Sequence, residues 1–244
     1  ERTIGSVHTD DLQQWLERHY APNRLILVAA GKVQHDRLVE LGEAGVGDMM
    51  PASKVIAEPA LFVGGSRFER RRGDQAHIAI AMPAPRWDAD DAYASQLFAD
   101  AVGSGASSRL FQELREEQGL AYSVAAGAQN YSDCGIFWAY VATSPSDSGW
   151  AHREVERVLA ETAEWLSQAE VDRARALAKA GMMMSLESCW GQASYLATRL
   201  LREGRLVEPA EIVARLDAVT LAGVREAGAR MLAGPRGRAR GGAR

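Results

Sequence analysis

Arg115 and Tyr122 are the residues of this sequence whose types and spacing best fit a site of chemistry. They lie seven residues apart in SSRLFQELREEQGLAYSV (107–124), which predicts a helix that ends at Gly119 and a strand that follows at once. A guanidinium and a phenol held together could grip a substrate. A second interpretation stays open, because a cation in the last helical turn complements the helix dipole and Tyr122 would share a strand face with Val124, as a core tyrosine does.

The glycine-rich segment GSGASS (103–108) lies between two expected helices. It is neither a phosphate loop, since no lysine follows its last glycine, nor a G-x-S-x-G nucleophile elbow, since no strand leads into it. It could leave backbone unshielded where an extended chain can approach. Gly103, Gly105 and Ser107 are therefore candidate substrate-binding residues, and a flexible helix-to-helix linker is the alternative.

Metal ligands do not gather anywhere along the chain. Zinc sites on helices place two histidines about one turn apart, beside an acid. The two cysteines, Cys134 and Cys189, are far apart and form no C-x-x-C pair. The sequence therefore indicates no metal site of its own. The histidines are scattered surface or capping residues: His8, His19, His35, His77 and His152.

Composition indicates a folded protein with an acidic body. The chain has 244 residues, of which 47% are hydrophobic, and no apolar run approaches the about 20 residues of a membrane span. We expect a soluble protein of the cytoplasm or periplasm. The net charge is -4, but the last eleven residues carry four arginines and no acid, which leaves the rest at -8. Nucleic acid is disfavoured as a partner because binding it requires a basic surface. The tail resembles an Arg/Gly-rich RNA-binding segment, but we interpret residues 234–244 as a disordered end.

Strand signals cluster in the middle of the chain and helical signals follow them. Apolar runs and alternation predict strands, with 120–129 and 134–144 joined as a hairpin by NYSD, whose Asn and Asp suit a turn. This order predicts an α+β fold, a largely antiparallel sheet with helices packed on it. Strands are expected at 24–31, 65–72, 75–85, 120–129 and 134–144, and helices at 9–21, 35–48, 90–103, 107–118, 151–166, 171–182, 196–201, 209–217 and 220–232.

Pro51 and Pro59 interrupt both periodicities and predict a boundary near residue 57. Segments 6–20 and 218–232 resemble each other at an offset of 212, which duplication would leave. We therefore predict the end of a first domain at 1–57, a second similar domain at 58–233 and a disordered tail at 234–244. The tail stands where a strand is expected after the first copy but has no strand character, so we expect the sheet edge there to be incomplete. Because the chain begins at Glu1, we expect a fragment.

The runs QAHIAIAMPAP, GSGASSRLFQELREEQGLAYSVAAGAQNYSDCGIFWAYVAT and SLESCWGQASYLATRLLREGR resemble the second half of the insulinase, or mitochondrial processing peptidase, family of zinc metallopeptidases. TDDLQQWLERHYAPNRLILVAAGKV resembles the end of that family's first half. The resemblance covers residues 4 to about 233, as judged from these motifs.

The resemblance implies a protein of two similar α/β halves that encloses and cleaves unfolded peptides. Its first half carries H-x-x-E-H, which this sequence lacks, so zinc would be held outside this segment, in an N-terminal half or in a partner. An N-terminal half in cis and a homodimer or heterodimer partner are implied. The resemblance also implies that Arg115 and Tyr122 orient the substrate and stabilise the developing oxyanion. The alternative is a non-catalytic subunit or structural partner of such a peptidase.

Overall fold

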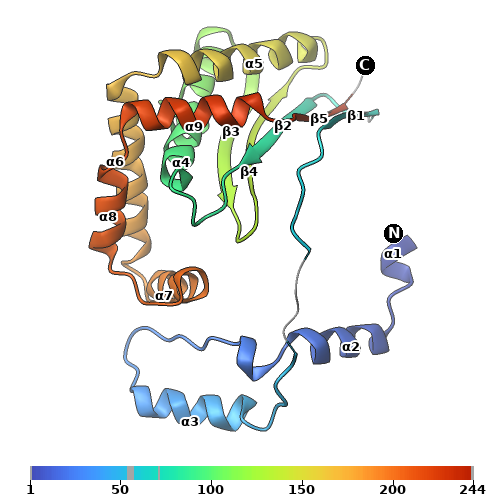
Figure 1. Ribbon diagram of the computed structural model, residues 1–244. Helices are drawn as coiled ribbons and strands as arrows, with labels where there is room; N and C mark the ends of the chain where they lie inside the picture. Colours follow the sequence, from blue (N-terminus) through green and yellow to red (C-terminus); the bar gives the residue numbers. More distant parts are fainter. Residues whose placement is uncertain (1, 54–57, 71, 243–244) are drawn as a thin grey trace. The chain divides into compact units, whose positions relative to one another are not determined.

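The computed structural model describes residues 2–53, 58–70 and 72–242. It divides into two compact units, which are described separately (Figure 1). Unit 1 comprises Glu1–Glu58 and Met183–Val207, and unit 2 comprises Pro59–Met182 and Glu208–Arg244. The predicted boundary at residue 57 lies outside the described residues. The division differs from the predicted one in grouping Met183–Val207 with unit 1.

Unit 2 is built on a five-stranded sheet of order β1-β5-β2-β4-β3. The three strands β2, β4 and β3 pair antiparallel, with β4 between the other two, and β5 runs antiparallel to β2 but parallel to β1. The α+β fold with a largely antiparallel sheet is therefore confirmed, and so is the hairpin. The strands are β1 (Gly65–Arg70), β2 (Ala76–Ala84), β3 (Ala121–Asn130), β4 (Gly135–Thr143) and β5 (Gly237–Gly242).

The tail prediction was wrong, because most of the segment expected to be disordered is strand β5. It lies inside the sheet, and hydrogen bonds to β1 on one side and β2 on the other satisfy its backbone. Its arginines are also held: Arg238 Nη2 lies 2.7 Å from Glu156 Oε1, and the Arg240 guanidinium lies 5.4 Å from the centre of the Phe68 ring. Pairing on both sides compensates for the low strand propensity of glycine. The sheet is complete at this position.

Helices cover one face of the sheet. α4 packs on β3, while α5 and α9 pack on each other and on β2 (Figure 1). Strands β2 and β4 alternate between buried and more exposed residues, so every second side chain faces these helices. The Phe98 and Phe137 rings meet in this core with centroids 5.8 Å apart. The helices of unit 2 are α4 (Ala92–Gly103), η2 (Phe111–Glu117), α5 (Ser148–Trp165), α6 (Gln168–Ser185), whose last residues fall in unit 1, α8 (Pro209–Asp217) and α9 (Leu221–Ala233).

The opposite side of the sheet is here named the open face. His77 is exposed, and Ala79 and Ala81 are half-buried, whereas Ile78 and Ile80 between them are buried. Residues paired across the strands share a face, so the register assigns further members to it. From β1, β5 and β4 these are Arg67, Ala239, Trp138 and Tyr140.

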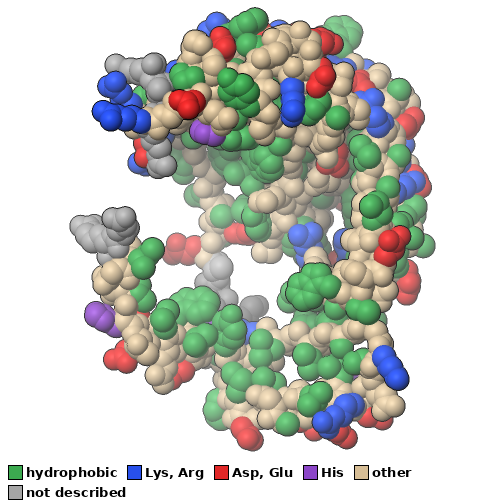
Figure 2. Space-filling model, turned by 180° about the vertical axis from the view of Figure 1, so that it is seen from behind, with side chains coloured by type: hydrophobic (Ala, Val, Ile, Leu, Met, Phe, Trp, Pro, Cys, Tyr) green, Lys and Arg blue, Asp and Glu red, His purple; other side chains and the backbone are tan. Residues whose placement is uncertain are grey.

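Unit 1 is helical, and its apolar residues are mostly uncovered. Neither α2 (Thr9–His19) nor α3 (His35–Val46) contains a buried residue, although both are amphipathic. Figure 2 shows apolar side chains at the surface of this unit. The remaining elements of unit 1 are α1 (Arg2–Gly5), η1 (Pro22–Arg24) and α7 (Cys189–Glu203).

The strand predicted at 24–31 does not form in the described chain. After η1 the backbone has no regular structure, and Leu27 keeps 59% of its surface exposed. A strand requires a partner for its backbone groups, and the described residues supply none here. The helices on either side are where the sequence predicts them.

Candidate functional site

The segment that carries Arg115 is a π-helix, η2, which the sequence did not predict. Gly119 adopts a left-handed conformation with φ +62° and ends the helix, as expected. Leu120 N donates to Leu114 O at 2.7 Å across this glycine, which satisfies a carbonyl of the last turn. Single turns of π-helix occur frequently at functional sites. The chain thus passes directly from η2 into β3.

Arg115 lies on the exposed side of η2. Its guanidinium is 4.9 Å from the centre of the Phe111 ring, one turn earlier. No carboxylate within the described ranges forms an ion pair with Arg115. Its neighbour Glu113 is by contrast engaged by Arg157 at 2.7 Å. Arg115 is therefore available to a group that the chain itself does not provide.

Tyr122 lies at a β-bulge. Ala121 pairs with Thr143 and Ser123 pairs with Ala142, so Tyr122 is an extra residue with no partner on β4. A bulge interrupts the alternation of strand faces and redirects a side chain. Tyr122 is 56% exposed, and Val124 beyond the bulge pairs with the buried Val141. The interpretation of Tyr122 as a core residue on the face of Val124 is therefore wrong.

Ion pairs fasten the start of η2. Arg157 of α5 reaches Glu113 of η2 and its own neighbours Glu154 and Glu161, at 2.7, 2.9 and 2.6 Å. These hydrogen bonds raise the pKa of Arg157. Two residues before η2 begins, Arg109 binds Glu170 at the start of α6. The helix that presents Arg115 is consequently tied to two helices of unit 2.

The structure separates the three residues predicted in GSGASS. Gly103 is buried, and a Cβ there would lie 2.2 Å from Ala126 N, so this glycine allows α4 to approach β3. The prediction that Gly103 binds substrate is therefore wrong. Gly105, with φ +78°, and Ser107 are exposed. Their roles stay predictions.

The loop is also less open than expected. Ser108 Oγ donates to Gly105 O at 2.8 Å, and Gln112 Nε2 donates to Ala106 O at 2.7 Å. Two carbonyls of the loop therefore already have partners, and an approaching chain would use other groups of this segment.

Arg115 and Tyr122 come from neighbouring elements, because η2 and the start of β3 pack on each other. Both side chains are exposed. In residues 2–53, 58–70 and 72–242 no hydrogen bond joins the two. The structure thus places the pair on adjacent elements without locking one to the other.

Sequence reasoning missed an aromatic group on the open face. His77 Nδ1 and Tyr140 Oη are 2.7 Å apart, and the two rings stack with centroids 6.0 Å apart. Trp138 lies across Gly127, where a Cβ would meet the indole at 2.9 Å. The available signal was the alternation of His77, Ala79 and Ala81 with buried residues of the same strand.

The described residues include no group of three or more His, Cys, Asp or Glu side chains able to hold a metal ion. Zinc therefore does not fit this part of the chain. Similarly, within the described ranges no helix has both the length and the apolar character needed to cross a membrane.

This geometry defines a class of domain, an α+β half that carries hydrogen-bond donors at one edge. The described residues of this half include no metal-ligand cluster. A family model described as "Peptidase M16 inactive domain" matches residues 6–177. The chain belongs to the M16 peptidase family, which confirms the resemblance seen in the sequence.

Relatives with curated names support this membership. An uncharacterized zinc protease of Streptomyces coelicolor is 30% identical over 228 residues, covering 89% of this chain and 50% of that protein. An uncharacterized zinc protease of Rickettsia felis is 27% identical over 213 residues, covering 87% and 52%. A probable mitochondrial-processing peptidase subunit beta of Schizosaccharomyces pombe is 29% identical over 238 residues, covering 90% and 51%. The chain spans about half the length of these relatives.

Solved structures share the fold. A peptidase M16 inactive domain from Pseudomonas fluorescens superposes with a TM-score of 0.84 at 20% identity, covering 100% of this chain and 60% of that one. A chain of complex III from Candida albicans gives a TM-score of 0.84 at 22% identity, covering 99% and 60%. At these identities the likeness concerns the fold alone.

Proposed function

We propose that this chain is the C-terminal half of a zinc-dependent endopeptidase that encloses and cleaves unfolded peptides. In this proposal Arg115 and Tyr122 orient the substrate backbone and stabilise the transition state. Zinc is bound outside this segment, by an N-terminal half in cis or by a partner chain. The proposal is consistent with the names of the relatives and with the description of the matching family model as an inactive domain.

The main observation behind the proposal is that the side chains of Arg115 and Tyr122 have no evident structural role among the described residues. The bulge leaves Tyr122 without a cross-strand partner, and Arg115 has no ion pair among the described residues. A tetrahedral intermediate develops negative charge, and fixed donors near it bind more strongly as that charge grows. Removing one such donor typically costs a factor of about 100 to 1,000 in turnover.

The edge of the sheet supports a peptide substrate. β3 is an edge strand of the described sheet, so one side of it has no strand neighbour. An extended peptide can add to such an edge through main-chain hydrogen bonds, which are indifferent to side-chain identity. Gly105 and Ser107, exposed before η2, are proposed to contact the same peptide. This mode of binding suits unfolded chains of varied sequence.

The uncovered apolar residues of unit 1 support a partner half. Trp15 and Leu16 of α2 keep 54% and 48% of their surface exposed, and Leu27 keeps 59%. Contiguous apolar surface of this kind marks a site of association. We propose that an N-terminal half covers it and that a homodimer or heterodimer partner completes the chamber.

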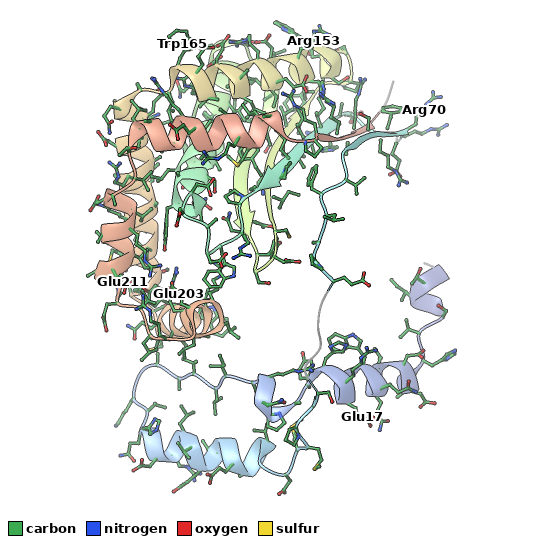
Figure 3. The ribbon with its side chains drawn as sticks, viewed as in Figure 1. Glu17, Arg70, Arg153, Trp165, Glu203 and Glu211 are labelled. Carbon is green, nitrogen blue, oxygen red and sulfur yellow. The ribbon has the colours of Figure 1, made fainter. Side chains whose placement is uncertain are left out.

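The experiment uses the full-length protein with any partner it requires. We expect chelator-sensitive cleavage of unfolded peptides, and a loss of turnover of about 100-fold in Arg115→Ala and Tyr122→Phe, with zinc content unchanged. Arg153→Ala on α5, exposed and marked in Figure 3, and Tyr131→Phe, 52% exposed in the β3–β4 turn, are matched controls. They should retain full turnover.

Normal turnover in both site variants would show that Arg115 and Tyr122 take no part in catalysis. If the full-length protein binds no zinc and cleaves no peptide, the non-catalytic subunit replaces the peptidase as the function of the chain. Zinc content and peptide turnover, measured on the same preparation, distinguish these outcomes.

A further inference from the structure

Two hollows flank Arg67 on the open face of unit 2. One, of about 650 Å³, is bordered by the β1–β2 turn and includes Glu69, Asp74 and His77. The other, of about 490 Å³, is apolar at one end, where Phe62 and Val63 lead into β1. Arg67 and its cross-strand partner Ala239 line both. Arg67 therefore lies between a cavity lined by charged residues and a cavity that is apolar at one end.

The hollows exist because β5, which lies at the base of both, carries only small side chains on the open face. On the open face β5 carries only Gly237, Ala239 and Gly241, and their neighbours Gly65, Ala79 and Ala81 are small as well. The Phe62 ring covers Gly237, where a Cβ would meet it at 3.5 Å. An arginine on such a floor can reach a ligand that lies against the backbone.

Arg67 and Arg72 are the arginines at the larger hollow whose guanidinium groups have no ion pair or ring contact with a described residue. Arg236 and Arg238 share Glu156, at 3.2 and 2.7 Å, and Arg240 stacks on Phe68. Within the described ranges the Arg67 side chain has no hydrogen bond or ion pair. The larger hollow is lined by Arg67 and Arg72 beside two carboxylates, Glu69 and Asp74, whereas Arg240, which also borders it, pairs with the buried Ile78 on the other face.

A second donor faces the same hollow. His77 lines it, and the Nδ1 of His77 is occupied by Tyr140 Oη at 2.7 Å. When the Tyr140 hydroxyl donates to Nδ1, the imidazole proton resides on Nε2. Sheet spacing places the Cα atoms of Arg67 and His77 roughly 12 Å apart, a span that both side chains can close on one ligand.

We propose that Arg67 anchors a carboxylate of the peptide substrate on the open face, with His77 as a second donor. A guanidinium binds a carboxylate through charge-assisted and often paired hydrogen bonds. The residue next to the carboxylate places an apolar side chain in the hollow beside Phe62. The carboxylate belongs either to an Asp or Glu side chain or to the C-terminus of the peptide.

The register also predicts where the anchor lies relative to the cleaved bond. Ser123, beside the Tyr122 bulge, shares a row of the sheet with Ala142, His77, Gly241 and Glu69. Four strand spacings of about 4.8 Å separate β3 from β1, roughly 19 Å. A peptide segment that leaves the β3 edge and crosses the open face in extended form covers this distance in about six residues. The anchored acid should therefore lie about six residues from the scissile bond, which makes this inference rest on the proposed function.

The experiment measures peptide binding by fluorescence anisotropy in the chelator-treated, full-length protein. The probes are a labelled 14-residue peptide with Glu about six residues from its cleavage site, its Gln version, and each with a free or amidated C-terminus. We expect the carboxylate to improve affinity about tenfold and Arg67→Gln to abolish the difference. If amidation removes the preference the source is the C-terminus, and if Gln removes it the source is the side chain.

Arg70→Gln is the matched control. Arg70 lies on the same strand but on the other side of the sheet from Arg67, and it lines neither hollow (Figure 3). It should keep the tenfold preference. The anchor is refuted if no peptide prefers its acidic form, or if the preference survives Arg67→Gln in a protein with unchanged thermal unfolding. A protein that cleaves nothing but still shows the Arg67-dependent preference would overturn the peptidase proposal and retain the anchor.

Discussion

Arg109 and Glu170 form a two-pronged ion pair, in which Arg109 Nε lies 2.5 Å from Glu170 Oε1 and Nη2 lies 3.0 Å from Oε2. Arg109 Nη2 also donates to Trp165 O at 2.9 Å, at the end of α5 (Figure 3). Both side chains are less than one-fifth exposed. The pair joins the start of the η2 segment to the corner between α5 and α6.

Glu170→Gln should destabilise the protein by about 2 kcal/mol at pH 7, because Arg109 then loses its charged partner in a partly buried position. Chemical denaturation of both proteins gives the difference. Glu164→Gln, an exposed position on α5, should stay within about 0.5 kcal/mol of the parent. Equal stability of parent and Glu170→Gln would show that the pair contributes nothing.

The same pair makes stability depend on pH. Burial acts to raise the pKa of Glu170, but hydrogen bonds from Arg109 and Ser167 outweigh it and lower the pKa to about 2. A carboxyl whose pKa is lower in the folded state stabilises above its unfolded value of 4.5 and loses this contribution as the pH falls toward 2. Solvent screening limits the contribution to about 1–2 kcal/mol. The difference between parent and Glu170→Gln should shrink by that amount between pH 6 and pH 2.5.

Asp100 of α4 should act in the opposite sense. Burial raises its pKa to about 6, and a hydrogen bond from Gln96 only partly offsets this. The folded state therefore retains a proton that the unfolded state releases near pH 4, so stability falls as the pH rises from about 4 to about 6. Asp100→Asn should stabilise the protein by about 1–3 kcal/mol at pH 7 and flatten this region of the pH profile. The exposed Asp90→Asn is the control, and a parent profile that rises from pH 4 to 6 would contradict the prediction.

Two glycines of the same loop should respond differently to alanine. Gly103→Ala places a methyl 2.2 Å from Ala126 N and should cost at least about 2–3 kcal/mol, since backbone cannot yield as a side chain does. Gly105 has φ +78° but open space around it, so Gly105→Ala should cost only about 1 kcal/mol of backbone strain. Thermal unfolding of the two variants measures the contrast. Similar losses would mean that α4 and β3 can move apart.

Local patterns predicted much of this fold because their signals are local. Gly119 ended its helix as expected, and the apolar run at 75–85 formed β2, which lies inside the sheet. The segment around Arg115 and Tyr122 indicated the family, since its residue types and spacing are written in one continuous run. A period of two was also present in the tail, where Arg236, Arg238 and Arg240 alternate with glycine and alanine, but low strand propensity obscured it.

Tertiary structure decided whatever depends on a distant partner. Residues 237–242 became a strand because β1 and β2 lie on both sides, whereas 24–31, richer in strand formers, remained irregular because the described chain offers no partner. Neighbouring strands likewise determined three features of the site region. The bulge against β4 turned Tyr122 outward, the contact with β3 buried Gly103, and the small residues of β5 left Arg67 between two hollows. Backbone hydrogen bonds of a sheet are satisfied between segments far apart in sequence, so the sequence alone specifies the candidates and the pairing selects among them.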